Sequence, residues 1–234
     1  MLPVFCFSLT IGKYSRDRER IDGRLSVMES HSVRLLGVSG SPREASTAFV
    51  IKQALNYATK KFDAEADYFS LQNKNIVFCD HCDYCMREKR GCIHEDDMLE
   101  AYDKMERTDA FIIGTPVYNG SVSGQLKTFF DRCRGLVAKN PDVLKNKVGA
   151  AVAVGGDRLG GQELALLTIH SFYLANKVIP TSGGPFGANL GGTVWSKDLG
   201  QKGAEQDSEG LKTVYKTVDR LMELATQLRR LRQV

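Results

Sequence analysis

From residue 33 onward, short apolar runs alternate with longer segments whose apolar residues recur at helical spacing. The predicted strands span residues 33–38, 67–71, 110–114, 147–154 and 178–181. The first run is almost continuously apolar, which is typical of a strand buried on both faces of a sheet. Alternating strands and helices predict an α/β fold with a parallel sheet that carries helices on both faces.

Helical patterns separate these strands. One helix begins near Thr47 and places Val50, Ala54, Ala58 and Phe62 on one side. Further helices are predicted around residues 98–105, 126–133, 163–176 and 208–228. The glycine-rich region 183–192 is expected to be an ordered loop. Five strands with intervening helices favour a flavodoxin-like, doubly wound, five-stranded parallel sheet.

Length and composition fit one folded domain with an extension. The chain has 234 residues, of which 42% are hydrophobic and 26% are charged. Residues 1–32 show no clear strand or helix period and contain an internal Met28. We therefore predict an N-terminal extension at 1–32, either poorly ordered or produced from an upstream start codon. The folded domain is expected at 33–234.

Charge and cysteine content exclude several classes of partner. The 32 basic and 28 acidic side chains are interspersed and give a formal net charge of +4, so no nucleic-acid groove is expected. No segment approaches the length of a membrane-spanning helix, so no membrane contact is expected. Six cysteines in a chain that is neither short nor obviously secreted argue against a disulfide framework. We expect a cytoplasmic protein.

The loop between the first strand and the first helix, residues 39–47, contains four hydroxyl side chains and one guanidinium. Free N–H groups and the dipole at a helix N-terminus favour an anion, and the hydroxyls add donors. Neither the dinucleotide fingerprint G-x-G-x-x-G nor the nucleotide motif G-x-x-x-x-G-K-[ST] is present there. Helix capping alone would need one hydroxyl rather than four. The loop therefore indicates a site for a single phosphate group.

Two further loops follow predicted strands, where open α/β sheets bind their ligands. The loop at 115–120 combines a stiff proline, the flat ring of Tyr118 and the amide of Asn119. The loop at 155–161 contains four glycines, which let the backbone approach a ligand closely. Taken alone, an ordinary packed tyrosine and an ordinary glycine-rich turn are open alternatives.

Four cysteines form the most specific motif: Cys79, Cys82, Cys85 and, after six further residues, Cys92. Three thiolates at i, i+3 and i+6 can wrap around one object, and a fourth can close the loop. This compactness suits a [4Fe–4S] cluster, in which each corner iron needs one thiolate. Structural zinc more often uses two well-separated C-x-x-C pairs. The motif favours a cluster, with zinc, disulfides and inert buried thiols as the alternatives.

Together, the three loops resemble the NADPH-dependent FMN reductase and flavodoxin-like superfamily. The resemblance covers most of residues 33–195 and includes P-V-Y and S-G-Q-L-K within 114–132 and G-G-D-R-L-G-G-Q-E at 155–163. A compact C-x2-C-x2-C-x6-C insertion in such a domain resembles the iron–sulfur flavoprotein family of archaea and other anaerobes. The resemblance implies an FMN domain at 33–234 with a [4Fe–4S] loop at 79–92.

The same resemblance implies the site residues. The FMN phosphate would be held by the loop at 39–47, and residues 116–120 and 155–158 would bracket the isoalloxazine ring. The expected FMN-binding residues are Ser39, Ser41, Pro42, Arg43, Ser46, Thr47, Pro116, Val117, Tyr118, Asn119, Gly120, Gly155, Gly156, Asp157 and Arg158. The expected cluster ligands are Cys79, Cys82, Cys85 and Cys92.

The family implies a redox protein that transfers electrons between its [4Fe–4S] cluster and FMN. Reduced ferredoxin is the implied donor, a small molecule such as O2 or H2O2 the implied acceptor, and a homo-oligomer, dimer or tetramer, the implied assembly. The alternative is an NAD(P)H-dependent FMN or quinone reductase in which the metal loop is structural. A pure electron carrier without a substrate is a third hypothesis.

Overall fold

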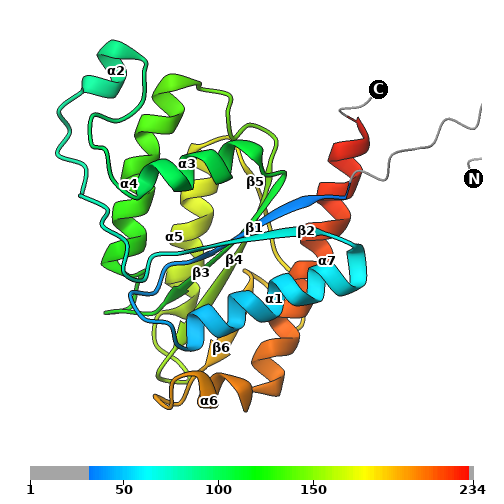
Figure 1. The fold of residues 1–234 in the computed structure, drawn as a ribbon. Helices are drawn as coiled ribbons and strands as arrows, with labels where there is room; N and C mark the ends of the chain where they lie inside the picture. The colour runs from blue at the N-terminus through cyan, green and yellow to red at the C-terminus, as the bar shows by residue number, and fades with distance from the viewer. Residues whose placement is uncertain (1–31, 232–234) are drawn as a thin grey trace, which may run out of the picture. The chain divides into compact units, whose positions relative to one another are not determined.

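The computed structural model describes residues 32–231. Apart from Ser32, the predicted extension at 1–32 lies outside the described residues. The rest forms a parallel sheet with helices on both faces, which confirms the predicted α/β class (Figure 1). None of the helices in the described part of the chain is long and apolar enough to cross a membrane.

The sheet contains six parallel strands. Their order is β2-β1-β3-β4, followed by β5 and β6, which both pair with β4. The strands are β1 (Arg34–Ser39), β2 (Glu65–Ser70), β3 (Ala110–Pro116), β4 (Val148–Gly155), β5 (Ile179–Thr181) and β6 (Gly192–Trp195). This is the flavodoxin-like order, with the last position divided between two strands.

The expectation of five strands was wrong by one. The eight-residue β4 pairs with β5 through Val148–Ala150 and with β6 through Val152–Gly155, so one three-residue strand cannot cover it. The glycine-rich loop lies between the two strands. At Gly191, φ is +139° and an added Cβ would lie 2.3 Å from the Ala151 carbonyl oxygen, so glycine lets the chain return to the sheet.

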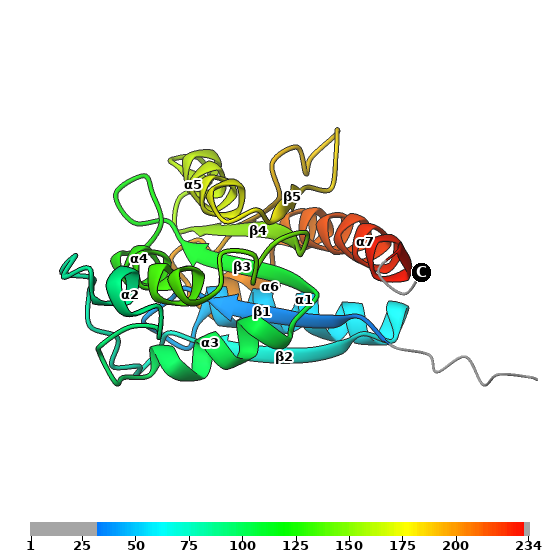
Figure 2. The same cartoon turned by 90° about the horizontal axis from the view of Figure 1, so that it is seen from above.

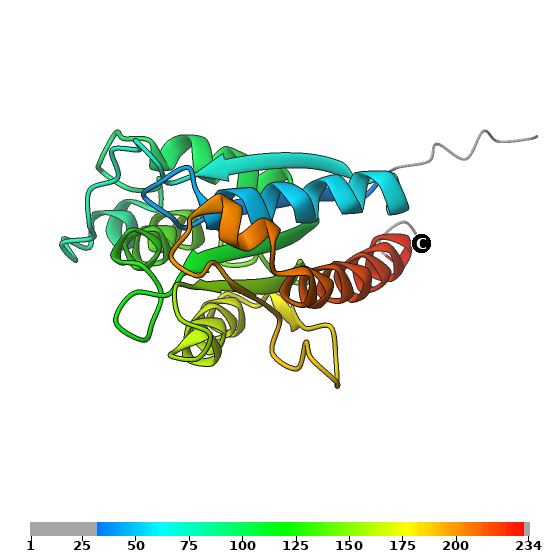
Figure 3. The same cartoon turned by 90° about the horizontal axis from the view of Figure 1, so that it is seen from below.

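Each face of the sheet carries a helical layer. Figure 3 shows one layer in front of the strands, and Figure 2 views the molecule from the opposite side. The first layer consists of α1 (Ser46–Phe62), α6 (Gln201–Glu205) and α7 (Ser208–Leu231). The second consists of α3 (Met98–Arg107), α4 (Gly124–Lys139) and α5 (Gln162–Ala175), with the short α2 (Tyr84–Glu88) in the cysteine segment.

Two apolar clusters, one on each side of the sheet, form the core. The predicted stripe of α1 is confirmed, because Val50, Ala54 and Ala58 are buried against β1, β3 and β4. On the other face, Phe129 and Cys133 of α4 are buried against α3 and α5. The two layers hold the strands in register, so the carboxyl ends of β1, β3 and β4 lie together.

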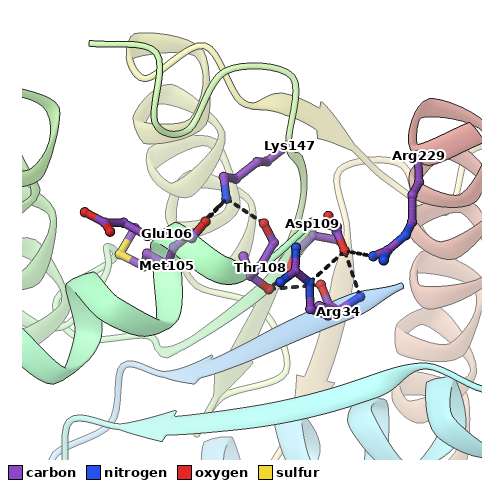
Figure 4. Close-up of polar contacts among 8 residues, drawn as sticks. Arg34, Met105, Glu106, Thr108, Asp109, Lys147 and Arg229 are labelled. Atoms are coloured by element: carbon purple, nitrogen blue, oxygen red, sulfur yellow. Dashed lines mark hydrogen bonds and ion pairs between the residues drawn. The ribbon is translucent and has the colours of Figure 1, made fainter. Parts of the chain in front are cut away.

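Polar contacts tie the opposite end of the sheet together (Figure 4). The Asp109 carboxylate accepts from the Arg34 backbone N–H at 3.0 Å and pairs with the Arg229 guanidinium near the end of α7. The buried Lys147 ammonium donates to the Met105 and Glu106 carbonyl oxygens at 2.9 and 2.8 Å. These contacts fasten α3 and α7 to the amino ends of the strands and leave the carboxyl ends for a ligand.

Candidate functional site

A cleft of about 280 Å3 lies at the carboxyl ends of β1, β3 and β4. All three loops that the sequence singled out line this cleft. The expected FMN-binding residues in its wall are Ser41, Arg43, Ser46, Thr47, Pro116, Val117, Tyr118, Gly155, Gly156 and Asp157. Their convergence follows from the parallel sheet, because loops that leave neighbouring strands at the same edge must meet there.

One end of the cleft is the N-terminus of α1. Ala45 occupies the N-cap position, and no side chain caps the helix. The first N–H groups of α1 are therefore not used by a capping side chain, and Ser46 and Thr47 lie beside them. Simple capping was the alternative explanation for these hydroxyls, and the structure does not contain that cap. Free helix N–H groups, hydroxyls and the Arg43 guanidinium suit a phosphate.

The other end of the cleft has two tight turns. Tyr118 and Ser121 exchange backbone hydrogen bonds of 2.9 and 3.0 Å, and Tyr118 stays partly exposed. Across the cleft, an added Cβ at Gly155 would lie 2.3 Å from Gln162 Nε2, and one at Gly156 would lie 2.1 Å from Asp198 Oδ1. Glycine at these two positions therefore lets the second turn pack closely against Gln162 and Asp198, which also line the cleft.

Five of the expected FMN-binding residues do not line the cleft: Ser39, Pro42, Asn119, Gly120 and Arg158. The Ser39 side chain is fully buried at the end of β1. The Arg158 guanidinium lies over the Trp195 ring, 5.7 Å from its centroid, and lines a neighbouring groove instead. These residues flank the cleft rather than form its wall.

The cleft also contains polar residues that the sequence reading missed, namely Gln162, Ser196 and Asp198. The Gln162 amide donates to the Asp157 carbonyl oxygen at 2.8 Å and holds the second turn in shape. Ser196 and Asp198 follow β6, the strand that was not predicted. The rule that ligands lie beyond strand ends would have found them had that strand been identified.

Cys79, Cys82, Cys85 and Cys92 line one small cavity between the cysteine segment and α4. All four are free thiols, and all but Cys82 are partly buried. Burial raises the pKa of the Cys85 thiol, Arg134 opposes this shift, and the other three thiols add to it. The Cys79, Cys82 and Cys92 thiols therefore lie close enough to Cys85 to interact with it electrostatically.

Buried nitrogen donors lie beside the four thiols in the wall of this cavity. Within residues 32–231, no three His, Cys, Asp or Glu side chains surround a single-ion position. The thiols nevertheless share one cavity, and three buried nitrogens of residues in its wall, Arg132 Nε, Arg134 Nη1 and His94 Nε2, have no hydrogen-bond partner in the described part of the chain. A group with several acceptor atoms, such as the sulfides of a cluster, would satisfy such donors.

A buried ion pair closes the cysteine segment at its base. Arg132 on α4 pairs with Asp96 through contacts of 2.6 and 3.0 Å, and their side chains are 1% and 3% exposed. Asp96 also accepts from the Val77 N–H at 3.0 Å, while Arg132 Nη1 donates to the Val77 carbonyl oxygen. The residues that precede the first cysteine and follow the last one are thus joined.

The cleft and the cysteine cavity are separate. They share no lining residue, and Figure 1 shows α2, which lies in the cysteine segment, beside α4. Ser123 at the start of α4 and Arg134 within it are about 16 Å apart along the helix axis, at 1.5 Å per residue. Within one chain, the cysteine cavity and the cleft therefore lie apart.

Comparison with known proteins identifies the family. Residues 33–191 match the family described as NADPH-dependent FMN reductase. Iron-sulfur flavoprotein MJ0731 of Methanocaldococcus jannaschii is 56% identical over 197 residues, which are 84% of this chain and 99% of that protein. An iron-sulfur flavoprotein of Archaeoglobus fulgidus is 46% identical over 194 residues, 83% of this chain and 98% of that protein.

A solved structure also has a similar fold. The flavodoxin, WrbA-like protein from Agrobacterium tumefaciens has a TM-score of 0.57 at 19% identity, over 84% of this chain and 99% of that one. This similarity supports the flavodoxin-like fold. The resemblance inferred from the loops and the cysteine motif is confirmed, and the chain belongs to the iron–sulfur flavoproteins of the NADPH-dependent FMN reductase family.

Proposed function

We propose that this protein is a flavin redox protein that transfers electrons between a [4Fe–4S] cluster and FMN. The observation that carries the proposal is the pairing of two built sites in one chain, four thiols around one cavity and three loops around one cleft. A cluster exchanges one electron at a time, whereas FMN accepts one or two, so together they convert single-electron input into two-electron chemistry.

The cleft residues would bind FMN by its two ends. The N–H groups at the start of α1, with Ser41, Ser46 and Thr47, would hold the phosphate, and Arg43 would neutralise its charge. The turns at 116–120 and 155–158 would bracket the isoalloxazine ring. Because the second turn presents backbone to the ring, its N–H groups would provide hydrogen bonds without a catalytic side chain.

The thiols of Cys79, Cys82, Cys85 and Cys92 would hold the cluster, one per iron. The separation of the two sites along α4 bears on the assembly. If two subunits bring the cysteine segment of one to the cleft of the other, the electron path shortens, which fits the dimer or tetramer that the family resemblance implies. We propose the cytoplasm as the compartment, since an iron–sulfur cluster held by thiolates suits a reducing environment.

We propose reduced ferredoxin as the donor and a small molecule such as O2 or H2O2 as the acceptor. The competing function is that of an NAD(P)H-dependent FMN or quinone reductase with a structural metal loop. One observation favours this competitor: a groove of about 990 Å3 adjoins the cleft through Gly160 and Gln162 and is large enough for a nucleotide.

Anaerobic purification with iron, sulfide and flavin analysis and EPR spectroscopy tests the proposal. We expect four iron and four sulfide per chain, one FMN, and a cluster signal on reduction. Stoichiometric zinc without sulfide would contradict it. Stopped-flow mixing then separates the two functions, because flavin reduction by NADPH but not by reduced ferredoxin would establish the competitor.

A further inference from the structure

Arg134 on α4 lines the cysteine cavity, where its charge interacts with Cys79 and Cys85. Its Nη2 pairs with the Asp83 carboxylate, which lies between Cys82 and Cys85. Its positive charge interacts with the Cys85 and Cys79 thiols. The guanidinium is therefore the cation that α4 places against the C-x2-C-x2-C part of the motif.

The ion pair with Asp83 does not account for the whole side chain. The Arg134 and Asp83 side chains are 31% and 44% exposed, and ion pairs of such exposure contribute little to stability. The other terminal nitrogen, Nη1, is buried, and no described residue accepts a hydrogen bond from it. A buried donor without an acceptor is costly, so its position calls for a partner that the polypeptide does not supply.

Arg132, the other arginine in the cavity wall, has a different role. Its guanidinium is taken up by Asp96 and the Val77 carbonyl oxygen at the base of the segment. The carboxylates of Asp80 and Asp131 also line the cavity, so the surroundings are not uniformly positive. Arg132 Nε and His94 Nε2 are also buried without a partner among the described residues, but the Arg134 charge is the one that interacts with the Cys85 and Cys79 thiols.

We infer that Arg134 donates a hydrogen bond from Nη1 to the group held by the four cysteines and raises its reduction potential. The inference rests on the proposed function, since it assumes a bound cluster. Reduction adds one electron and hence one negative charge at the thiols, without a proton. A guanidinium in the wall of the same cavity stabilises the more negative state, and hydrogen bonds to cluster sulfurs act in the same direction.

The test is an anaerobic redox titration with dithionite, followed by EPR, on the intact protein. R134Q should shift the midpoint potential to a more negative value, and R134K, which keeps the charge but loses the planar fork, should lie between R134Q and the wild type. The control R87Q removes an exposed cation of the same segment, whose guanidinium donates to the Cys82 carbonyl oxygen at 2.9 Å. A shift in R134Q no larger than that in R87Q would refute the inference.

A second control distinguishes a direct effect of Arg134 on the reduction potential from a structural role in holding the cysteine loop. D83N breaks the ion pair but leaves Arg134 in place, and asparagine tolerates the positive φ of 59° at this position. A structural role predicts that D83N shifts the potential in the same direction as R134Q, whereas the inferred role predicts no negative shift. If both R134Q and R134K lose iron and sulfide while D83N keeps them, Arg134 serves assembly and the inference is wrong.

Measurements on the wild-type protein distinguish failure of the proposed function from failure of the role inferred for Arg134. Absence of iron and sulfide from the wild-type protein would overturn the proposed function itself. A loaded wild type with an unchanged potential in R134Q would overturn the role of Arg134 alone.

Discussion

Asp96 has a carboxylate that is almost completely buried. Burial would raise its pKa, but the Arg132 guanidinium and the N–H groups of Val77 and Met98 outweigh burial and hold the pKa below its ordinary value. A group whose folded pKa is depressed stabilises the native state above its unfolded pKa, about 3.9 for Asp, and loses that contribution as the pH falls through the folded value.

Asp96→Asn should therefore lower the free energy of unfolding at pH 7. As the pH falls, the free energy of unfolding of this variant should decrease less than that of the wild type. The substitution leaves the Arg132 charge buried without its counter-ion, which costs about 3–5 kcal/mol. Denaturant unfolding of both proteins from neutral pH to about pH 3 measures the effect, since the gap should narrow below about pH 4.

Asp142→Asn is the matched control. Its ion pair with Lys177 has the same 2.6 Å separation but is more than half exposed, so we expect a much smaller loss of stability than in Asp96→Asn. Equal losses in the two variants would show that burial of the Asp96 pair carries no weight.

At the scale of single residues, the sequence predicted the site residues that lie close together along the chain. The four cysteines lie within one short segment, so their shared cavity could be inferred from the motif. The Arg132–Asp96 pair could not, because its members are 36 positions apart and belong to elements that only the tertiary fold brings together. Nothing in the sequence alone marked Arg134 as different from a surface arginine.

Among the elements, the contact between β4 and α5 depends on one glycine. Gly149 faces the fully buried ring of Tyr173, whose hydroxyl donates to the Ala150 carbonyl oxygen at 2.8 Å. An added Cβ at Gly149 would lie 2.7 Å from three ring atoms. A rigid ring held by its hydrogen bond cannot turn aside without moving the helix.

Gly149→Ala should lower the free energy of unfolding by about 1–3 kcal/mol, the usual cost of overpacking a core. Gly124→Ala, at the first position of α4, is the control, because no atom lies within 4 Å of the added Cβ. Denaturant unfolding compares the two. A Gly149→Ala variant as stable as the control would mean that α5 adjusts freely on the sheet.

Element length explains most of the predictions that succeeded or failed, although the three-residue β5 was predicted from its apolar run. Helices of 10 residues or more, such as α3 and α7, show their apolar period clearly and were predicted. The five-residue α2 and α6 and the four-residue β6 are too short to show a period and were missed. Missing β6 also hid Ser196 and Asp198, so an error in an element became an error in the site.

On the scale of the molecule, the cysteine cavity and the cleft are lined by different residues. The cysteine cavity is formed by residues 79–94 and the middle of α4, while the cleft is formed by the loops at the strand ends. Their separation could not be inferred from the sequence, because a cysteine segment that follows β2 can fold toward the cleft or away from it.

Cys85→Ser should therefore abolish the cluster signal and leave the FMN content per chain unchanged. Flavin and iron analyses on the same anaerobic preparation measure both quantities. Cys133→Ala, which alters a buried core thiol outside both walls, should retain both cofactors. Loss of flavin in proportion to iron in Cys85→Ser would mean that the cysteine segment supports the cleft.

The contacts that Arg132 makes with Val77 and Asp96 have a consequence for a subunit that loses its iron. These residues stay joined without any help from the thiols, so loss of iron can loosen only the stretch at 78–95. If the segment holds an iron–sulfur cluster, we expect a subunit that has lost it to rebind iron and sulfide without first unfolding.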